Sequence, residues 1–364
     1  MRKIFLILGT SLSFFIICFL LFIYFTSEHF SDTEAASFFC KGAAAKTLDL
    51  NRPIKVLTWN IQFLAGKRYV FFYDAMDGSG KDEAPSLADT ELTLKEVTRV
   101  LNDENPDIIL LQEVDVDAKR TYYQDQVQLL FEALSTHFPC VSSSYYWRAG
   151  FVPHPHILGS VGLKLATFSK YKIEKSERHA LGDFPSDIIT RQFHPKRAIL
   201  ESLIATTQGL PFHVLNTHLE AYSQGSDLMQ HQVDVTSQLL QQIDKLKHPW
   251  VLGGDFNLLM PGKKSYYDLS PLQRSLYQEK SELHVLTDQF QVVPLPSEIN
   301  SDTSGKWYTH FPNDPEVKGP DRTIDFLFFT SQFKNTDHYV RSHDTLKISD
   351  HLPLIGEFIW LGAQ

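Results

Sequence analysis

Short apolar runs that recur after residue 53 constrain the fold of this chain most strongly. Each run is rich in β-branched and aromatic residues and is only long enough for one buried strand. Between them, apolar residues recur at helical spacing in segments 90–107, 125–138 and 227–246. The runs that we expect to be strands are 54–61, 108–114, 161–173, 196–205, 211–218, 249–255, 322–329 and 352–360. This pattern predicts an α/β protein in which helices cover a pair of packed sheets.

Length and composition are compatible with one large globular domain and disfavour nonspecific binding to nucleic acid. The chain has 364 residues, and 43% of them are hydrophobic. A single large domain can hold roughly 250–300 residues around its core. The formal net charge is −9, whereas a protein that grips duplex phosphates usually presents a basic face.

The N-terminus differs from the rest of the chain. Arg2 and Lys3 precede a run, residues 4–25, that carries no charge and is about as long as the ~20 residues that a bilayer-spanning helix needs. We therefore expect a signal anchor over 1–25, a tether over 26–52 and a catalytic domain over 53–364. Basic residues tend to stay on the cytoplasmic side, which predicts a single-pass protein with a noncytoplasmic catalytic domain. Cleavage near Ala36 followed by secretion is the alternative.

The three cysteines give little information. Cys18 lies inside the uncharged run, and no pair has the C-x-x-C spacing of a zinc or redox motif. In an oxidising compartment Cys40 and Cys140 could pair. The sequence allows no inference about a protein partner or an oligomeric state.

Polar side chains stand at the ends of the predicted strands. Any one of them has a structural explanation as a turn or capping residue. Together they indicate one site, because side chains at strand ends of such sheets often converge. Two glycines before Asp255 would allow close backbone approach, and Asp255 and Asn257 would point to one side of an extended segment. The set is Asn60, Glu113, His218, Asp255, Asn257, Asp325, Asp350 and His351.

Six motifs carry a resemblance to a known family. In order they are "TWN", "LLQEVD", "NTHLEA", "GGDFN", "IDFLFF" and "SDHLPL". In this combination the chain resembles the endonuclease/exonuclease/phosphatase superfamily, with its deoxyribonucleases and neutral sphingomyelinases, over residues 54–360. The resemblance implies a four-layer α/β/β/α sandwich of two packed mixed sheets. It also implies hydrolysis of a phosphoester, assisted by Mg²⁺ or, as an alternative, Mn²⁺.

The resemblance also implies a role for each polar residue. Glu113 would be the main metal ligand, with Asn60 beside it and Asp350 next to the metal. Asp255 would orient or deprotonate water, while Asn257 and His218 would hold phosphate oxygens. His351 would be the catalytic histidine, oriented by Asp325. These residue types suit the reaction, since Mg²⁺ prefers hard oxygen ligands and a His–Asp pair supplies a positioned acid or base.

The substrate is less well specified. Phe326 follows Asp325 where the inositol polyphosphate 5-phosphatases carry Arg, which disfavours that activity. Arg322 is a candidate phosphate contact or a surface residue. The uncharged N-terminal run and the acidic charge favour a phospholipid or sphingomyelin diester. An aromatic segment, 142–155, would rest at the lipid surface through Tyr145, Tyr146, Trp147 and Phe151.

A nuclease is the alternative, with the same aromatic side chains stacking on bases and with Lys67, Arg68 and Arg148 contacting phosphates. A noncatalytic binding protein on this fold is a third reading. We also expect long loops over 62–89, 141–160 and 291–321. Loops of this length are usually functional, and Phe71, Phe72 and Tyr73 in the first would either form an aromatic ridge beside the site or pack inward.

Overall fold

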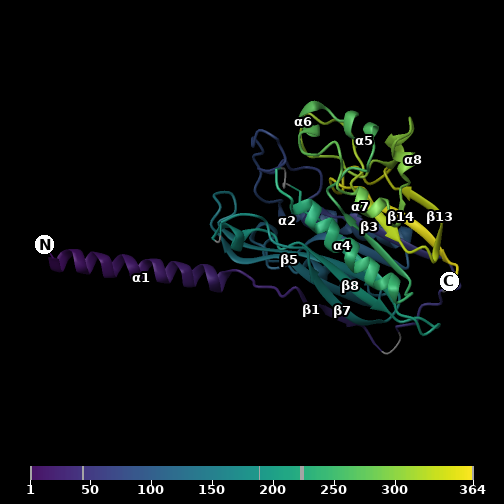
Figure 1. Ribbon diagram of the computed structural model, residues 1–364, viewed down its shortest axis with the longest axis horizontal. Helices are drawn as coiled ribbons and strands as arrows, with labels where there is room; N and C mark the ends of the chain where they lie inside the picture. Colours follow the sequence, from purple (N-terminus) through teal and green to yellow (C-terminus); the bar gives the residue numbers. More distant parts are fainter. Residues whose placement is uncertain (1, 43–44, 188, 222–224, 363–364) are drawn as a thin grey trace.

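The computed structural model describes residues 2–42, 45–187, 189–221 and 225–362. Residue 1, residues 43–44 of the expected tether and residues 363–364 of the expected catalytic domain lie outside the described part. Two seven-stranded sheets pack face to face, and helices cover their outer faces (Figure 1). The predicted arrangement of two packed mixed sheets with helices is confirmed.

The first sheet contains the strands of the first two motifs and of the last one. Its central strands β3 and β4 run parallel, and the other neighbours are antiparallel. In spatial order the strands are β13 (Phe333–Val340), β14 (Leu354–Trp360), β3 (Ile54–Asn60), β4 (Ile108–Asp115), β6 (Gly159–Ser169), β5 (Cys140–Val152) and β2 (Ser37–Cys40).

The second sheet has the same mixed character, with β9 and β10 parallel at its centre and the other pairs antiparallel. In spatial order the strands are β1 (Thr33–Ala35), β7 (Ile173–Ala180), β8 (Ala198–Ile204), β9 (Phe212–His218), β10 (Trp250–Asp255), β12 (Asp325–Phe329) and β11 (Gln291–Val293).

Three helices form the outer layers. α2 (Leu87–Glu104) and α3 (Gln126–Leu134) bury Val97, Leu101 and Leu130 against the first sheet. α4 (Leu228–Lys245) buries Val233 and Leu240 against the second. Shorter helices lie in the connections: α5 (Lys263–Tyr267), α6 (Pro271–Arg274), α7 (His284–Thr287), α8 (Pro296–Ile299), η1 (Gln62–Leu64), η2 (Lys119–Thr121), η3 (Thr190–Phe193) and η4 (Ser304–Trp307).

The two glycines before Asp255 allow close approach, Gly253 to the facing sheet and Gly254 to the neighbouring strand β9. A Cβ atom on Gly253 would lie 2.6 Å from Leu110 Cδ1 of the facing sheet, and one on Gly254 would lie 2.0 Å from the carbonyl oxygen of Thr217. Real Cβ atoms do not approach other atoms so closely. The expectation that these glycines allow close backbone approach is therefore confirmed.

Two expectations about the connections are wrong. Segment 141–160 is not a long loop, because most of it belongs to β5 and the start of β6. The segment 26–52 is only partly a tether: β1 pairs with β7 of the second sheet, and β2 pairs with β5 of the first. These edge strands satisfy backbone groups that a free linker would leave to water. Cys40 and Cys140 form a disulfide between β2 and β5, as the sequence allowed.

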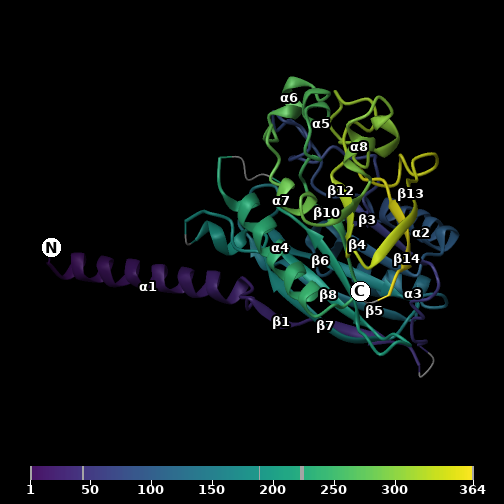
Figure 2. The same cartoon turned by 45° about the vertical axis from the view of Figure 1, so that its right-hand side comes forward.

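The helix α1 (Arg2–Thr26) precedes the sheets and projects away from them (Figures 1 and 2). Its side chains are described from Thr10 onward except at position 23. Large apolar side chains are exposed along it, among them Phe14, Phe15 and Phe25. A search over the described residues finds no helix with both the length and the apolar character needed to cross a bilayer. Membrane attachment through residues 4–25 stays a prediction.

Candidate active site

Strand direction alone brings most of the predicted residues to one edge of the sandwich. β3 and β4 are parallel, so Asn60 and Glu113 end side by side. β9 and β10 are also parallel, which places His218 directly opposite Asp255. β12 runs antiparallel to β10, so that its first residue, Asp325, pairs with Asp255 as well. Strand ends that are far apart in sequence therefore meet at one place.

Two site residues have an unusual backbone conformation. Glu113 lies in a bulge of β4 with φ of 56°, and Asn257 has φ of 50°. Both values are in the left-handed region, which non-glycine residues seldom adopt, and such conformations cluster at functional sites. The expectation that Asp255 and Asn257 share one face of an extended segment is wrong. The chain turns after Asp255, whose Oδ1 accepts a hydrogen bond from the Asn257 backbone N–H at 2.9 Å.

Two carboxylates and one amide lie together where a metal ion would bind. Glu113 Oε1 accepts a hydrogen bond from Asn60 Nδ2 at 3.1 Å, while Asn60 Oδ1 accepts one from the Gln62 backbone N–H at 3.0 Å. Burial and the charge of Glu113 raise the pKa of the Asp350 carboxyl group to about 6. Two carboxylates thus lie close enough to disfavour each other's charge, which a divalent cation would relieve. The donor set of Glu113, Asp350 and Asn60 fits a hard cation such as Mg²⁺.

His351 lies between two carboxylates. Its Nδ1 is 2.8 Å from Asp325 Oδ2, and its Nε2 is 3.4 Å from Asp255 Oδ2. Burial acts to lower the pKa of His351, but the charges of Asp325 and Asp255 outweigh it and raise the pKa to about 10. The imidazole is therefore protonated at neutral pH. In this state it can donate a proton or stabilise negative charge.

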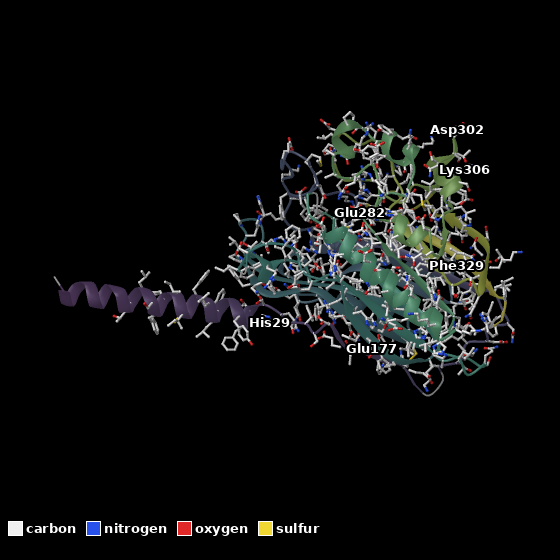
Figure 3. The ribbon with its side chains drawn as sticks, in the orientation of Figure 1. His29, Glu177, Glu282, Asp302, Lys306 and Phe329 are labelled. Carbon is white, nitrogen blue, oxygen red and sulfur yellow. A yellow bond between two sulfur atoms is a disulfide. The ribbon has the colours of Figure 1, made fainter. Side chains whose placement is uncertain are left out.

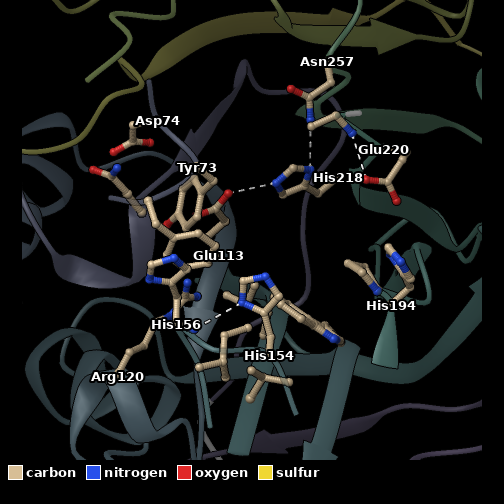
Figure 4. Close-up of a pocket in the computed structure, with 18 of the residues that line it drawn as sticks. Tyr73, Asp74, Glu113, Arg120, His154, His156, His194, His218, Glu220 and Asn257 are labelled. Atoms are coloured by element: carbon tan, nitrogen blue, oxygen red, sulfur yellow. Dashed lines mark hydrogen bonds and ion pairs between the residues drawn. The ribbon is translucent and has the colours of Figure 1, made fainter. Parts of the chain in front are cut away.

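The ring nitrogens of His218 each face an oxygen atom. Nε2 lies 3.0 Å from Glu113 Oε1 and Nδ1 lies 3.0 Å from the carbonyl oxygen of Leu219 (Figure 4). Although burial raises the pKa of Glu113, the hydrogen bond from His218 is among the interactions that lower it to about 2. Glu113 is therefore ionised, as a metal ligand must be. Asn257 Nδ2 donates to Leu219 O at 3.1 Å, next to the His218 ring.

A cavity of about 770 Å³ opens beside these groups. Glu113, His218, Asp255, Asn257, Asp350 and His351 all line it. Its other walls are largely apolar and aromatic, with Phe72 and Tyr73 from the loop after β3. Tyr73 lies beside Glu113 in Figure 4. Phe71 instead packs inward against Phe63. The loop that sequence left unassigned is thus divided between the core and the cavity.

Several residues that line the cavity were not predicted. His310 lies with its ring 4.5 Å from that of His351, and Asp74 has a pKa raised to about 7 by burial and by the charge of Asp350. Tyr146, which the sequence placed at a lipid surface, is instead fully buried at the cavity wall, 5.4 Å from the His218 ring. These residues lie in long connections or in a strand that carries no motif, so no sequence pattern marks them. Only the three-dimensional structure brings them to the site.

The expected substrate contacts are mostly engaged within the protein. Lys67 Nζ donates to the carbonyl oxygens of Phe311 and Pro312. Arg68 pairs with Asp89, and Arg148 pairs with Glu28. Arg322 lines the cavity but is buried and donates to Asp321 and Gln273. The expectation that Tyr146 rests at a lipid surface is wrong, because its side chain is fully buried.

The sandwich and the site together define a class of protein, the phosphoester hydrolases that act with a divalent metal. Residues 57–351 match the model of the Endonuclease/Exonuclease/phosphatase family. This chain belongs to that family, and its members are hydrolases of phosphoester bonds that depend on divalent metal. The expected membership is confirmed. No curated protein matches the chain.

Solved structures support the fold. A Beutenbergia cavernae protein described as endonuclease/exonuclease/phosphatase is 19% identical with a TM-score of 0.59, over 86% of this chain and 72% of that one. The catalytic domain of human Nocturnin with bound sulfate is 18% identical with a TM-score of 0.50, over 89% and 97%. Zebrafish (D. rerio) TDP2 complexed with a single-strand DNA product is 15% identical with a TM-score of 0.51, over 84% and 98%. At these identities the likeness concerns the fold alone.

Proposed function

We propose that this chain is a magnesium-dependent phosphodiesterase. The observation that carries the proposal is the position of His351 between Asp325 and Asp255, beside the carboxylates of Glu113 and Asp350. Grouping these buried charges lowers the stability of the fold. Such groups are expected at a catalytic site, where they act on the substrate, rather than in a noncatalytic binding protein.

The residues of the chain divide the work of hydrolysis. Asp255 accepts the proton of the attacking water, and protonated His351 stabilises or protonates the departing oxygen. His218 and Asn257 donate hydrogen bonds to nonbridging phosphate oxygens. A divalent cation held by Glu113, Asp350 and Asn60 would neutralise charge on the phosphate. Asp325 fixes the ring orientation of His351 through the 2.8 Å contact at Nδ1.

We further propose a phospholipid-type diester as the substrate. The apolar wall of the cavity, which includes Trp147, Val161 and Phe193, suits a substrate with an apolar group near its phosphate. The cations expected to contact nucleic acid are engaged by carbonyl oxygens or carboxylates, and binding of DNA depends on free lysine and arginine. An acidic chain gains little from a polyanion.

A nuclease is the second candidate, and one observation favours it. Phe72 stacks on His154 and His156 at the cavity, with ring centroids 5.3 and 4.7 Å apart. Such rings can also stack on unpaired bases. The zebrafish structure in complex with a single-strand DNA product belongs to a protein of the same fold.

A substrate panel separates the two candidates. The full chain is used, because a chain beginning at residue 41 would lack β1, β2 and Cys40. With Mg²⁺ we expect release of phosphocholine from sphingomyelin or phosphatidylcholine vesicles, and little cleavage of plasmid DNA or RNA. Trp147→Ala should lower vesicle hydrolysis more than hydrolysis of a small soluble diester. Robust cleavage of nucleic acid without phosphocholine release would replace the lipid proposal by the nuclease.

We also propose that residues 4–25 attach the catalytic domain to a membrane, with the domain on the noncytoplasmic side. Support comes from the uncharged sequence and from the exposed apolar side chains of α1. Protease added to intact cells should digest the domain, and the chain should sediment with membranes after a carbonate wash. A domain that is protected in intact cells would reverse the orientation. A chain recovered in the medium with its N-terminus near Ala36 would instead support secretion.

A further inference from the structure

A second cluster of histidine and glutamate side chains lies on the outer face of the second sheet. It comprises Glu177, His179, Glu201, His213 and His248, named here the histidine–glutamate cluster. Glu177 is directly opposite Glu201 on neighbouring strands, and His179 follows on the same face of β7. His213 comes from β9 and His248 from the segment before β10. Glu177 marks the position in Figure 3, at the lower edge of the body.

The cluster is held together by direct contacts. Glu201 Oε2 is 2.7 Å from His179 Nε2, and Glu201 Oε1 is 2.5 Å from His213 Nδ1. The second nitrogen of His213 is 2.9 Å from His248 Nδ1. Glu201 and His213 are buried, with relative exposures of 6% and 7%. One buried carboxylate is therefore oriented by two imidazoles, and a third imidazole orients one of these.

The two glutamates face each other across the strand pair. Like charges directly opposite each other on neighbouring strands are destabilising, and here the contacts of His179 and His213 with Glu201 offset part of that repulsion. Lys175 pairs with Glu177 at 2.7 Å, but both side chains of this pair are partly exposed and such pairs contribute little. A cation between Glu177, Glu201 and His179 would remove the repulsion.

We propose that the histidine–glutamate cluster is a binding site for a divalent transition metal of the zinc class. His179 Nε2 and one carboxylate oxygen each of Glu177 and Glu201 lie within 4.8 Å of one another. Ligands of tetrahedral zinc stand about 2 Å from the ion, so they lie roughly 3.3 Å apart. The three atoms need only small side-chain movements to reach this spacing, and water completes the shell.

The surroundings match what metal ligands require. A ligating carboxylate is usually fixed by a hydrogen bond to its other oxygen, and His213 occupies that position on Glu201, itself in contact with His248. Imidazole nitrogen favours zinc over magnesium. Binding replaces the proton between His179 Nε2 and Glu201 Oε2, so one proton is released for each ion bound at this pair.

The cluster is separate from the catalytic site. No member of it lines the catalytic cavity. His213 is five residues before His218 on β9, which corresponds to about 16 Å along a strand. An ion here would join the neighbouring strands β7 and β8, with β9 connected through the contact of His213 with Glu201, and would stabilise the sheet without contacting the substrate.

The test measures zinc affinity of the full chain after removal of metal with a chelator. Mg²⁺ is kept at a saturating concentration, and Zn²⁺ is titrated against a chromophoric chelator. We expect one bound zinc ion for each chain. His179→Ala and Glu201→Gln should weaken binding at least about tenfold, and His213→Gln should weaken it about 10- to 100-fold through the loss of orientation. Zinc should also raise the melting temperature of the wild type but not of His179→Ala.

Matched variants separate this site from other sites. His343→Ala removes a histidine whose side chain is 76% exposed, and Glu113→Gln alters the catalytic site; both should bind zinc as the wild type does. Retained hydrolysis with Mg²⁺ shows that His179→Ala is folded, and Glu177→Gln, at the exposed rim of the cluster, provides a second folded variant. Equal zinc affinity in the wild type, His179→Ala and Glu177→Gln would overturn the proposal. So would loss of the zinc site in Glu113→Gln, or no zinc binding by the wild type.

Discussion

The two sheets contribute different chemistry to the same site. From the first sheet and the segment before β14 come Asn60, Glu113 and Asp350, which we propose hold the cation. From the second sheet come His218, Asp255 and Asp325, which we propose handle protons and phosphate oxygens. Neither sheet alone carries both sets of residues that the proposed hydrolysis needs.

The two sets of site residues, one from each sheet, contact each other through a few atoms. Asn60 Nδ2 is 3.1 Å from both Glu113 Oε1 and Asp255 Oδ2, and so it joins the two sets. His351 follows Asp350 directly yet bonds to Asp325 of the other sheet. We expect the proposed metal-binding and proton-transfer functions to be separable by mutation, even though their groups are in contact. Activity lost through a change in the metal-binding residues should be recovered in part by more metal, whereas activity lost through a change in the proton-transfer residues should not.

The largest effect is expected from the proton-transfer half. His351→Ala and Asp255→Ala should each lower kcat by about 10³- to 10⁴-fold, because each removes a group that acts on the reacting atoms. The concentration of Mg²⁺ that gives half-maximal activity should change little. Steady-state kinetics over a range of Mg²⁺ concentrations measure both quantities. A defect that excess Mg²⁺ restores would contradict the division between the sheets.

A change in the metal-binding half should have a smaller and recoverable effect. Glu113→Gln keeps the size of the side chain but removes its charge, so activity should fall about 100-fold at ordinary Mg²⁺. Higher Mg²⁺ should recover part of it. Chelation should abolish wild-type activity reversibly, and Glu177→Gln serves as a control for removing a glutamate elsewhere. Full wild-type activity in excess chelator would refute the metal dependence.

The pH dependence of activity in Asp325→Asn should test whether the second sheet supplies the acid of the reaction through His351. We expect kcat to fall between about 10- and 100-fold, less than for His351→Ala, since Asp325 orients the imidazole without touching the substrate. The charge of Asp325 helps to raise the pKa of His351 to about 10. Activity that needs protonated His351 is lost as pH rises through this pKa. In the variant the loss should begin at lower pH, and an unchanged alkaline limb would show that His351 does not act as the acid.

Much of the site was predictable from sequence, because the ends of neighbouring parallel strands lie at the same edge of a sheet. Asn60, His218 and Asp255 end three strands and Glu113 lies near the end of a fourth, and the parallel pairs bring these residues together without any loop. The family match spans all four residues. The two sheets and their covering helices followed from periodicity, which reports burial directly.

The rest was not predictable for physical reasons. The sequence predicts a long loop over 141–160, yet most of the segment is β5, and Ser142 lies between the two sheets in contact with Ser202 of the second. Burial of Tyr146 depends on β8, whose Ala198 and Leu200 pack in the same cluster. Such long-range contacts leave no local signal in one sequence. The turn at Asn257 depends on a local side-chain hydrogen bond, which hydrophobic periodicity does not report.

The smallest effect concerns the acid dependence of metal binding. Asp350 must be ionised to bind a cation, and burial together with the charge of Glu113 raises its pKa to about 6. Above this pKa the carboxylate is ready to bind. Below it a proton competes, so the affinity for Mg²⁺ should fall about tenfold between pH 7 and pH 5, because one pH unit below a pKa leaves about one tenth of the group ionised. Glu113, with a pKa lowered to about 2, stays ionised over this range and does not contribute to the pH dependence of metal affinity.

Asp350→Asn should bind metal more weakly at every pH but should lose the pH dependence, as titration of Mn²⁺ binding would measure. If Asp325→Asn removed the slope instead, the proton that competes with metal would belong to the second sheet, and the separation of the two halves would be wrong.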